Sequence, residues 1–274
     1  MANWNKILSR GDVEDRRSNA PAIVGGLSLT GVAIVIAFNL LTGGSATDIL
    51  NQLQSIPVEQ KQNIDTSQFE GADNYEVFAS TVLGSDNDMW ASIFKQKNEV
   101  YTPPKLVLFR TATESGCGTA TSDVGPHYCP ADNTIYLDET FFDELTNRFG
   151  AKGGDVAEAY VIAHEVGHHA QNELGIMDEM QNGDENEMSV KLELQADCFA
   201  GLWAHSIRDS DVFQPGEIEE AIDAAAAVGD DRIQEKVTGQ VNPETWTHGS
   251  SAQRVSWFNR GYDSGTLDAC NTFK

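Results

Sequence analysis

Basic residues are scarce in this chain, and this limits the kinds of molecule that it can bind. Its 274 residues include 18 Lys and Arg against 42 Asp and Glu, which gives a formal net charge of −24 at pH 7. Nucleic-acid binding needs Lys and Arg in excess to neutralise phosphates, so the sequence argues against a nucleic-acid partner. A well-solvated acidic surface explains the charge without any partner. The length and the 40% apolar content suffice for one sizeable globular domain.

Residues 22–42 contain no charged side chain and are mostly apolar. About 20 such residues span the hydrocarbon core of a bilayer. Lys and Arg precede this stretch but are then absent until Lys61, and the positive-inside bias places the N-terminus in the cytoplasm. We therefore expect a single-pass cell-membrane protein with the part of the chain after Gly43 outside the cytoplasm. A cleaved signal peptide is the alternative, with Gly44-Ser-Ala46 as the cleavage site, although the apolar run is long for one.

These expectations divide the chain into four parts: a cytoplasmic tail at 1–21, a transmembrane helix at 22–42, a polar linker at 43–69 and a folded domain at 70–274. Apolar spacing within the domain predicts secondary structure in the order helices, strand, loop, strand and helix. The ranges are helices at 74–83 and 88–94, strands at 105–110 and 133–138, and a helix at 141–149. This order predicts an α+β fold with a small sheet.

Cysteine is also sparse, with four residues and no C-x-x-C pair, which argues against a cysteine-bound metal. An extracytoplasmic compartment permits disulfides, and four cysteines allow three sets of pairs. We favour Cys117–Cys129, which closes a Gly- and Pro-rich loop, with Cys198–Cys270, which ties the C-terminal tail to a helix. Four reduced, buried thiols are the alternative.

The stretch Ala163-His-Glu-Val-Gly-His-His169 is the most informative one in the chain. His164 and His168 are four residues apart, so on an α-helix they point from one face, one turn apart. At that separation two imidazoles can share one metal ion. Glu165 adjoins the first histidine, where it can act as the general base, as in zinc peptidases with an H-E-x-x-H motif.

The surrounding residues place this motif in the middle of a helix. Asp155 is followed three residues later by Glu158, a pattern typical of a capping box at a helix N-terminus. Gly175 supplies a helix stop after Leu174. The motif therefore has the helical setting that its metal geometry requires.

A catalytic zinc site usually has three protein ligands, so a third is needed. Glu193 and Asp197 are again four residues apart and face the same way on a second predicted helix. Glu193 can bind the metal, and Asp197 can accept a hydrogen bond from the non-ligating nitrogen of a zinc histidine and fix its tautomer. We predict one Zn²⁺ per chain, held by His164, His168 and Glu193.

Together the two motifs resemble those of the gluzincins, the thermolysin-like peptidases whose third ligand is the Glu of an E-x-x-x-D helix. Four stretches resemble more closely the bacterial "putative neutral zinc metallopeptidase" family of single-pass membrane proteins: Tyr128-Cys-Pro-Ala-Asp132, Ala163-His-Glu-Val-Gly-His-His169, Leu192-Glu-Leu-Gln-Ala-Asp-Cys-Phe-Ala-Gly201 and Thr247-His-Gly-Ser-Ser-Ala-Gln-Arg254. The resemblance covers about residues 70–274 and, loosely, the N-terminal anchor. It implies a zincin-like (gluzincin) catalytic domain with active-site helices and a small β-sheet, preceded by one transmembrane helix. His127 stands where that family suggests Phe, which bears on its loop and not on the zinc site.

Gluzincins usually add a donor for the oxyanion of the tetrahedral intermediate, and His248 is our candidate. It precedes a helix that Ser250 or Ser251 caps, a position from which it can face the site. Arg254 could orient His248 or Glu193. The alternative is a histidine of the capping region with no part in catalysis.

The combined pattern predicts a membrane-anchored zinc endopeptidase that hydrolyses peptide or protein substrates outside the cytoplasm. The strand at Thr134–Leu137 could pair with an extended substrate, as sheet edges do in peptide recognition. One alternative is a non-catalytic, zinc-stabilised binding module at the cell surface. Glu165 argues against it, because a structural zinc site needs no general base. Another is a zinc amidase that acts on cell-wall peptides.

Overall fold

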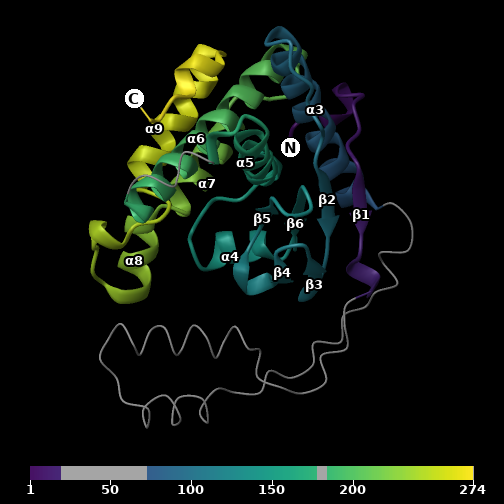
Figure 1. Cartoon of the computed structure of the whole chain (residues 1–274). Coiled ribbons are helices and arrows are strands. Elements are labelled where there is room, and N and C mark those ends of the chain that lie inside the picture. Colours follow the sequence, from purple (N-terminus) through teal and green to yellow (C-terminus); the bar gives the residue numbers. More distant parts are fainter. Residues whose placement is uncertain (20–72, 178–183, 274) are drawn as a thin grey trace. The chain divides into compact units, whose positions relative to one another are not determined.

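A computed structural model of the chain describes residues 1–19, 73–177 and 184–273 (Figure 1). The helices in these ranges are α3 (Asn74–Gln96), α4 (Phe141–Asn147), α5 (Asp155–Glu173), α6 (Glu185–Ile207), α7 (Ile218–Ala227), α8 (Asp230–Thr238) and α9 (Ser251–Ser264). The strands are β1 (Val13–Asp15), β2 (Lys105–Leu108), β3 (Ala112–Ser115), β4 (Gly118–Thr121), β5 (His127–Cys129) and β6 (Thr134–Leu137). The predicted α+β class is confirmed.

Four short strands form the main sheet, in the order β1-β2-β6-β5. The pairs β1–β2 and β2–β6 are parallel, whereas β5 runs antiparallel to β6. Side chains alternate between the two faces, so that Leu106 and Ile135 join the main core while Val107 and Tyr136 join a smaller cluster on the other face. Strands β3 and β4 form a separate antiparallel pair.

The position of β6 corrects one prediction. Strand Thr134–Leu137 lies between β2 and β5, so its backbone groups are already paired on both sides. It cannot offer an edge to an extended substrate, and the predicted substrate-pairing role of this strand is wrong. The edge strands of this sheet are β1 and β5.

One long helix, α3, occupies the region where the sequence predicts two. Asp73 caps it by accepting a hydrogen bond from the Glu76 amide at 2.8 Å. Gly84 lies inside the helix, where glycine is usually unfavourable. Here a Cβ would lie 2.5 Å from the Arg10 backbone nitrogen, so the close approach of another segment requires glycine.

Residues 1–19 belong to the same compact unit as the helices and the sheet. They supply β1, which pairs with β2 in the register Val13↔Leu106, and the side chain of Ile7 is buried in the core. The expectation of a separate polar tail at 1–21 is therefore wrong for residues 1–19, because their backbone and side chains complete the domain.

The predicted transmembrane helix at 22–42 and the linker at 43–69 lie outside the described residues. Among the helices in the described ranges, none has the length and apolar character needed to cross a membrane.

Helices α5 and α6 pack against each other, and α9 lies alongside α6 (Figure 1). Two glycines allow the close approach of α6 and α9. A Cβ on Gly201 would collide with the carbonyl oxygen of Phe258, and one on Gly261 would collide with that of Cys198. This approach brings Arg254 of α9 to the buried face of α6.

The four cysteines form two disulfides, Cys117–Cys129 and Cys198–Cys270, which are the pairs favoured from the sequence. The first joins the loop after β3 to β5, and the second joins α6 to the C-terminal segment. The alternative of four reduced thiols does not describe this structure.

The start of α5 differs from the predicted capping box. Gly154 is the N-cap residue, and Asp155 is the first residue of the helix. The Asp155 carboxylate accepts hydrogen bonds from the Ala2 amide at 2.8 Å and the Trp4 indole at 2.7 Å. Glu220 of α7 accepts one from the Val156 amide at 3.1 Å. One amide of the first turn is thus capped by Glu220, a residue distant in the sequence.

Glu158 on α5 carries a charge that the fold disfavours. Burial raises the pKa of its carboxyl, and the charge of Asp155 adds to the effect, so that the pKa is about 7 instead of 4.5. Because the folded pKa exceeds the unfolded one, this group stabilises the fold at low pH. The contribution is lost as the pH rises from about 4.5 through 7.

We expect Glu158→Gln to raise the free energy of unfolding at pH 8 by about 1–3 kcal/mol, because it removes a partly buried charge. At pH 5 the substitution should have little effect, since the native carboxyl is already protonated. Urea unfolding of both proteins at the two pH values measures the difference. An equal effect at both pH values would contradict a carboxyl that titrates near pH 7.

Candidate metal centre

Two histidines of α5 and one glutamate of α6 converge where the two helices pack together. The distance from His164 Nε2 to Glu193 Oε2 is 3.2 Å, and that from His168 Nε2 to Glu193 Oε1 is 3.3 Å. The candidate ligand atoms of these three residues all lie within 4.8 Å of one another. The structure therefore brings together the three residues that the sequence predicts as metal ligands.

Both histidines direct Nε2 toward Glu193, because Nδ1 of each ring has a hydrogen-bond partner elsewhere. His164 Nδ1 lies 3.0 Å from Asp197 Oδ1, as expected for a carboxylate that fixes the tautomer. His168 Nδ1 lies 2.9 Å from the side-chain oxygen of Gln171. An Nδ1–H in each ring leaves Nε2 with its lone pair free for a metal ion.

Asp197 lies at the centre of a buried network and has no exposed surface. Arg254 donates to it from Nε at 2.8 Å and from Nη2 at 2.9 Å. Tyr160 donates its hydroxyl hydrogen to Asp197 at 2.5 Å. Arg254 also lies 3.7 Å from Glu193. Arg254 thus supports the ligand set through Asp197, as well as by its approach to Glu193.

The charges in this cluster control its protonation. Burial alone would raise the pKa of Asp197, but the Arg254 guanidinium and His164 together outweigh it and hold this pKa below its usual value. Burial alone would lower the pKa of His164, but the bonds to Asp197 and Glu193 raise it to about 10. A divalent ion supplies the positive charge that such a site favours, and its binding would displace this proton.

Gln171 is a supporting residue that the sequence analysis does not identify. Its side-chain amide donates to the Leu192 carbonyl at 2.7 Å and to Gln195 Oε1 at 3.1 Å, both on α6. It therefore links His168 to the helix that carries Glu193. Its place on α5, one turn after His168, is a weak signal, because many helix positions share that spacing.

Glu165 lies on the same helix as the two histidines and is 7% exposed. Its negative charge raises the pKa of His168, an effect smaller than those of burial and of Glu193. The general base predicted from the sequence is thus a buried carboxylate beside the converging ligands.

His248 lies in the loop before α9, and its side chain is half exposed. Its Nδ1 is 3.2 Å from Asp230 Oδ1. The other Asp230 oxygen accepts hydrogen bonds from the backbone amides of the loop residues Thr247, His248 and Gly249, at 2.6–2.9 Å. Asp230 thus holds both the loop and the imidazole. It lies 18 residues before His248, and no local pattern connects the two.

The loop that carries His248 packs on α6 beside Glu193. A Cβ on Gly249 would lie 3.2 Å from Val190 and 3.3 Å from Leu194. Gly249 also has a φ of 89°, which favours glycine. These contacts place the residue after His248 against α6, at the positions three before and one after Glu193.

The remaining two histidines near the motif have structural partners. His169 is fully buried, and its ring nitrogens lie 3.1 Å from the Tyr128 hydroxyl and 2.7 Å from the Thr102 carbonyl. His127 on β5 lies 3.0 Å from the Gly125 carbonyl and stacks on Tyr136. These contacts give both histidines structural roles.

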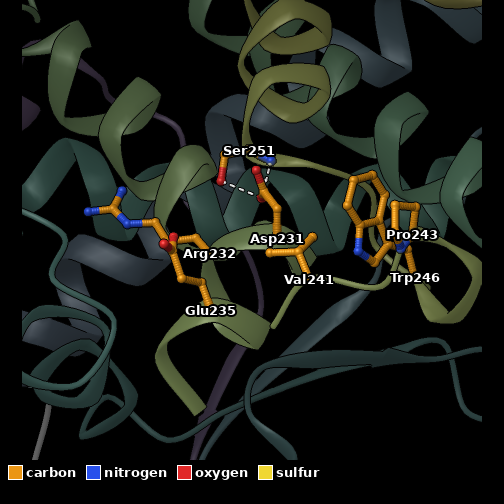
Figure 2. A pocket seen from close by; sticks show the side chains of 7 residues that line it. All are labelled: Asp231, Arg232, Glu235, Val241, Pro243, Trp246 and Ser251. Carbon is orange, nitrogen blue, oxygen red and sulfur yellow. Dashed lines mark hydrogen bonds between the residues drawn. The ribbon is translucent and has the colours of Figure 1, made fainter. Parts of the chain in front are cut away.

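A surface pocket lies beside the His248 loop, between α8, the 3₁₀ turn Pro243–Thr245 and the start of α9 (Figure 2). Asp231 in this pocket accepts hydrogen bonds from the Ser251 amide at 2.7 Å and the Ser251 hydroxyl at 2.8 Å. None of the residues that line it is one of the three candidate metal ligands.

The donor set fits zinc. Two neutral imidazoles and one carboxylate are a known ligand set of catalytic zinc sites, which keep a fourth position open for water or substrate. A structural site would normally be closed by four protein ligands. Among the described residues, this group is the one cluster of His, Cys, Asp and Glu that could hold a metal ion.

Sequence comparisons give the family. The family described as "Putative neutral zinc metallopeptidase" matches residues 2–273. The chain is 43% identical to YpfJ of Escherichia coli K12 over 283 residues, which cover 98% of each protein. It is 45% identical to Rv2575 of Mycobacterium tuberculosis H37Rv over 215 residues, which cover 74% of this chain and 73% of that protein. No solved structure matches, so the zincin-like fold stays a prediction. The chain belongs to the "Putative neutral zinc metallopeptidase" family.

Proposed function

We propose that this protein is a zinc-dependent endopeptidase that hydrolyses peptide bonds of peptide or protein substrates. The observation that carries the proposal is the convergence of His164, His168 and Glu193, with Glu165 on the same helix. A buried carboxylate next to an open three-ligand site has no role in a structural zinc site, but hydrolysis needs one as a general base.

Each side chain has a defined part in this mechanism. When bound, zinc would supply Lewis-acid polarisation of the scissile carbonyl and would make water acidic enough to attack near neutral pH. Glu165 accepts a proton from the attacking water and passes it to the leaving amine. His248, oriented by Asp230, donates a hydrogen bond to the oxygen that gains negative charge.

Strand β5 is our revised candidate for substrate pairing. It is an edge strand of the sheet and lies next to α5, where the Tyr128 hydroxyl contacts both His169 and Asn172. An extended peptide that adds to this edge would be bound through its backbone. Such binding favours weak sequence selectivity.

We also propose that the protein works outside the cytoplasm in association with the cell membrane. The two disulfides support this location, because they persist in oxidising compartments. The apolar residues 22–42 are the candidate for membrane contact.

Two other functions make different predictions for the same site. A zinc-stabilised binding module would hold zinc and cleave nothing. A zinc amidase would use the same residues but would cleave purified cell-wall material and no protein.

The main test compares the full chain with its Glu165→Gln variant, each loaded with one zinc ion. The full chain is needed because residues 1–19 supply β1. Both proteins are incubated with an unbiased peptide mixture, and the products are identified by mass spectrometry. We expect the wild type to cleave and a chelator to abolish cleavage. The variant should be slower by at least about 100-fold, because it lacks the general base.

The zinc content of both proteins, measured in parallel, controls for loss of the metal. Wild-type protein with one bound zinc and no activity on peptides or on cell-wall material would exclude hydrolysis and favour the binding module. Equal cleavage by the two proteins would exclude Glu165 as the base.

A second prediction concerns His248. We expect His248→Ala to lower kcat about 100-fold with little change in KM, because one oxyanion donor is worth about 3 kcal/mol in the transition state. His205→Ala is the matched control, since His205 lies twelve residues beyond Glu193 on α6, about 18 Å along the helix. Steady-state kinetics on a cleaved peptide measure both variants. Unchanged kcat in His248→Ala would leave His248 with a capping role alone.

A further inference from the structure

We propose that residues 1–19 and the metal centre lie on the same side of the membrane, because the N-terminal segment is a built-in part of the catalytic unit. A single membrane crossing between residues 19 and 73 would instead separate these two parts of one folded unit. The contacts of residues 1–19 with the rest of the unit are the same whatever reaction the metal centre carries out.

The backbone of the N-terminal segment is hydrogen-bonded along its length. Asn3 donates to the Val212 carbonyl at 2.7 Å, and Gly11 donates to the Ser80 carbonyl at 2.7 Å. On either side of the β1 pairing, the Leu106 amide donates to the Asp12 carbonyl at 2.9 Å, and the Arg16 amide donates to the Leu108 carbonyl at 2.8 Å. Strand β1 thereby covers one edge of the sheet, which would otherwise be left unpaired.

Arg17 fixes the end of the segment. Its side chain is fully buried. It pairs with Asp15 at 2.6 Å, with Asp73 at 2.9 Å and with Glu139 at 2.9 Å. A buried cation is tolerated only with such partners, and the partners in turn would lose their counter-charge without it. The three carboxylates therefore form a buried binding site for the Arg17 side chain of the N-terminal segment.

Two glycines show how closely the segment packs on α3. A Cβ on Gly84 would lie 2.5–2.7 Å from backbone atoms of Arg10, and one on Gly11 would collide with the Leu83 side chain. Both distances are far below a normal van der Waals contact. The close approach of residues 10 and 11 to α3 therefore accounts for a glycine in the middle of this helix.

The segment also contacts both helices that carry the metal ligands. Asp155, the first residue of α5, accepts hydrogen bonds from Ala2 and Trp4. The Trp4 ring stacks on Trp203 of α6, with ring centroids 6.4 Å apart. The N-terminal segment therefore supports one end of each metal helix.

Arg17 and Asp73, on either side of residues 20–72, bear on the membrane topology of the chain. Arg17 and Asp73 form an ion pair at 2.9 Å, so the chain leaves and re-enters the unit at neighbouring points. One membrane crossing would separate these residues by about 30 Å. A return crossing would need a second long apolar run, but 43–69 contains the charged residues Asp48, Glu59, Lys61 and Asp65. Arg17 and Asp73 therefore lie on the same side of the membrane.

The first test is the sidedness of two added cysteines in the full chain, expressed in cells. Leu8 is 88% exposed in the N-terminal segment, and Val100 is 86% exposed in the loop after α3. Leu8→Cys and Val100→Cys are each treated with a membrane-impermeant maleimide before and after membrane disruption. We expect both variants to give the same pattern, whichever compartment it indicates. Labelling of one in intact cells and of the other only after disruption would overturn the proposal.

The second test is the purified full chain with Gly84→Ala. If residues 10 and 11 did not pack against α3, Gly84→Ala should raise Tm, because alanine is the better helix former. Packing against Arg10 should reverse this sign and lower Tm by at least about 4 °C. Ser92→Ala, at an exposed position of α3, is the matched control and should not lower Tm. A higher Tm for Gly84→Ala would overturn the packed N-terminal segment.

Discussion

The arrangement of the metal helices depends on the buried carboxylate of Asp197. An unpaired charge at a fully buried position would be very costly. Its two oxygens are satisfied by Arg254 from α9 and by two residues of α5, His164 and Tyr160. Three helices therefore have to meet around one side chain, and the loss of any partner would leave part of a buried charge unsatisfied.

This requirement accounts for the packing around the centre. Arg254 reaches Asp197 only because Gly201 and Gly261 let α9 approach α6 closely. Glu193 lies one turn before Asp197 on the same helix, so the bonds that hold Asp197 also hold Glu193 opposite the two histidines. The ligands are thus preorganised by protein contacts, and a metal ion need not assemble the site from separate parts.

The sequence predicts the centre better than the sheet because the centre is encoded locally. Spacing of four residues on a helix brings His164 and His168 together, and the same spacing relates Glu193 to Asp197. Asp230 and Gln171 act across loops or between helices, where a single sequence has no fixed period. Strand β1 is only three residues long, Val13-Glu-Asp15, and gives no alternating pattern. Strand β6 lies inside the sheet because β2 and β5 pair with it on either side, and its own four residues do not encode this position.

The N-terminal segment shows how a local rule can mislead when tertiary contacts compete with it. The positive-inside rule counts basic residues next to an apolar run as free charges. Yet Arg16 pairs with Glu14, and Arg17 is enclosed by three carboxylates of the folded unit. Their nearest counter-charges are therefore in the protein itself. The location of the metal centre is then better argued from its two disulfides than from the charges that precede residue 22.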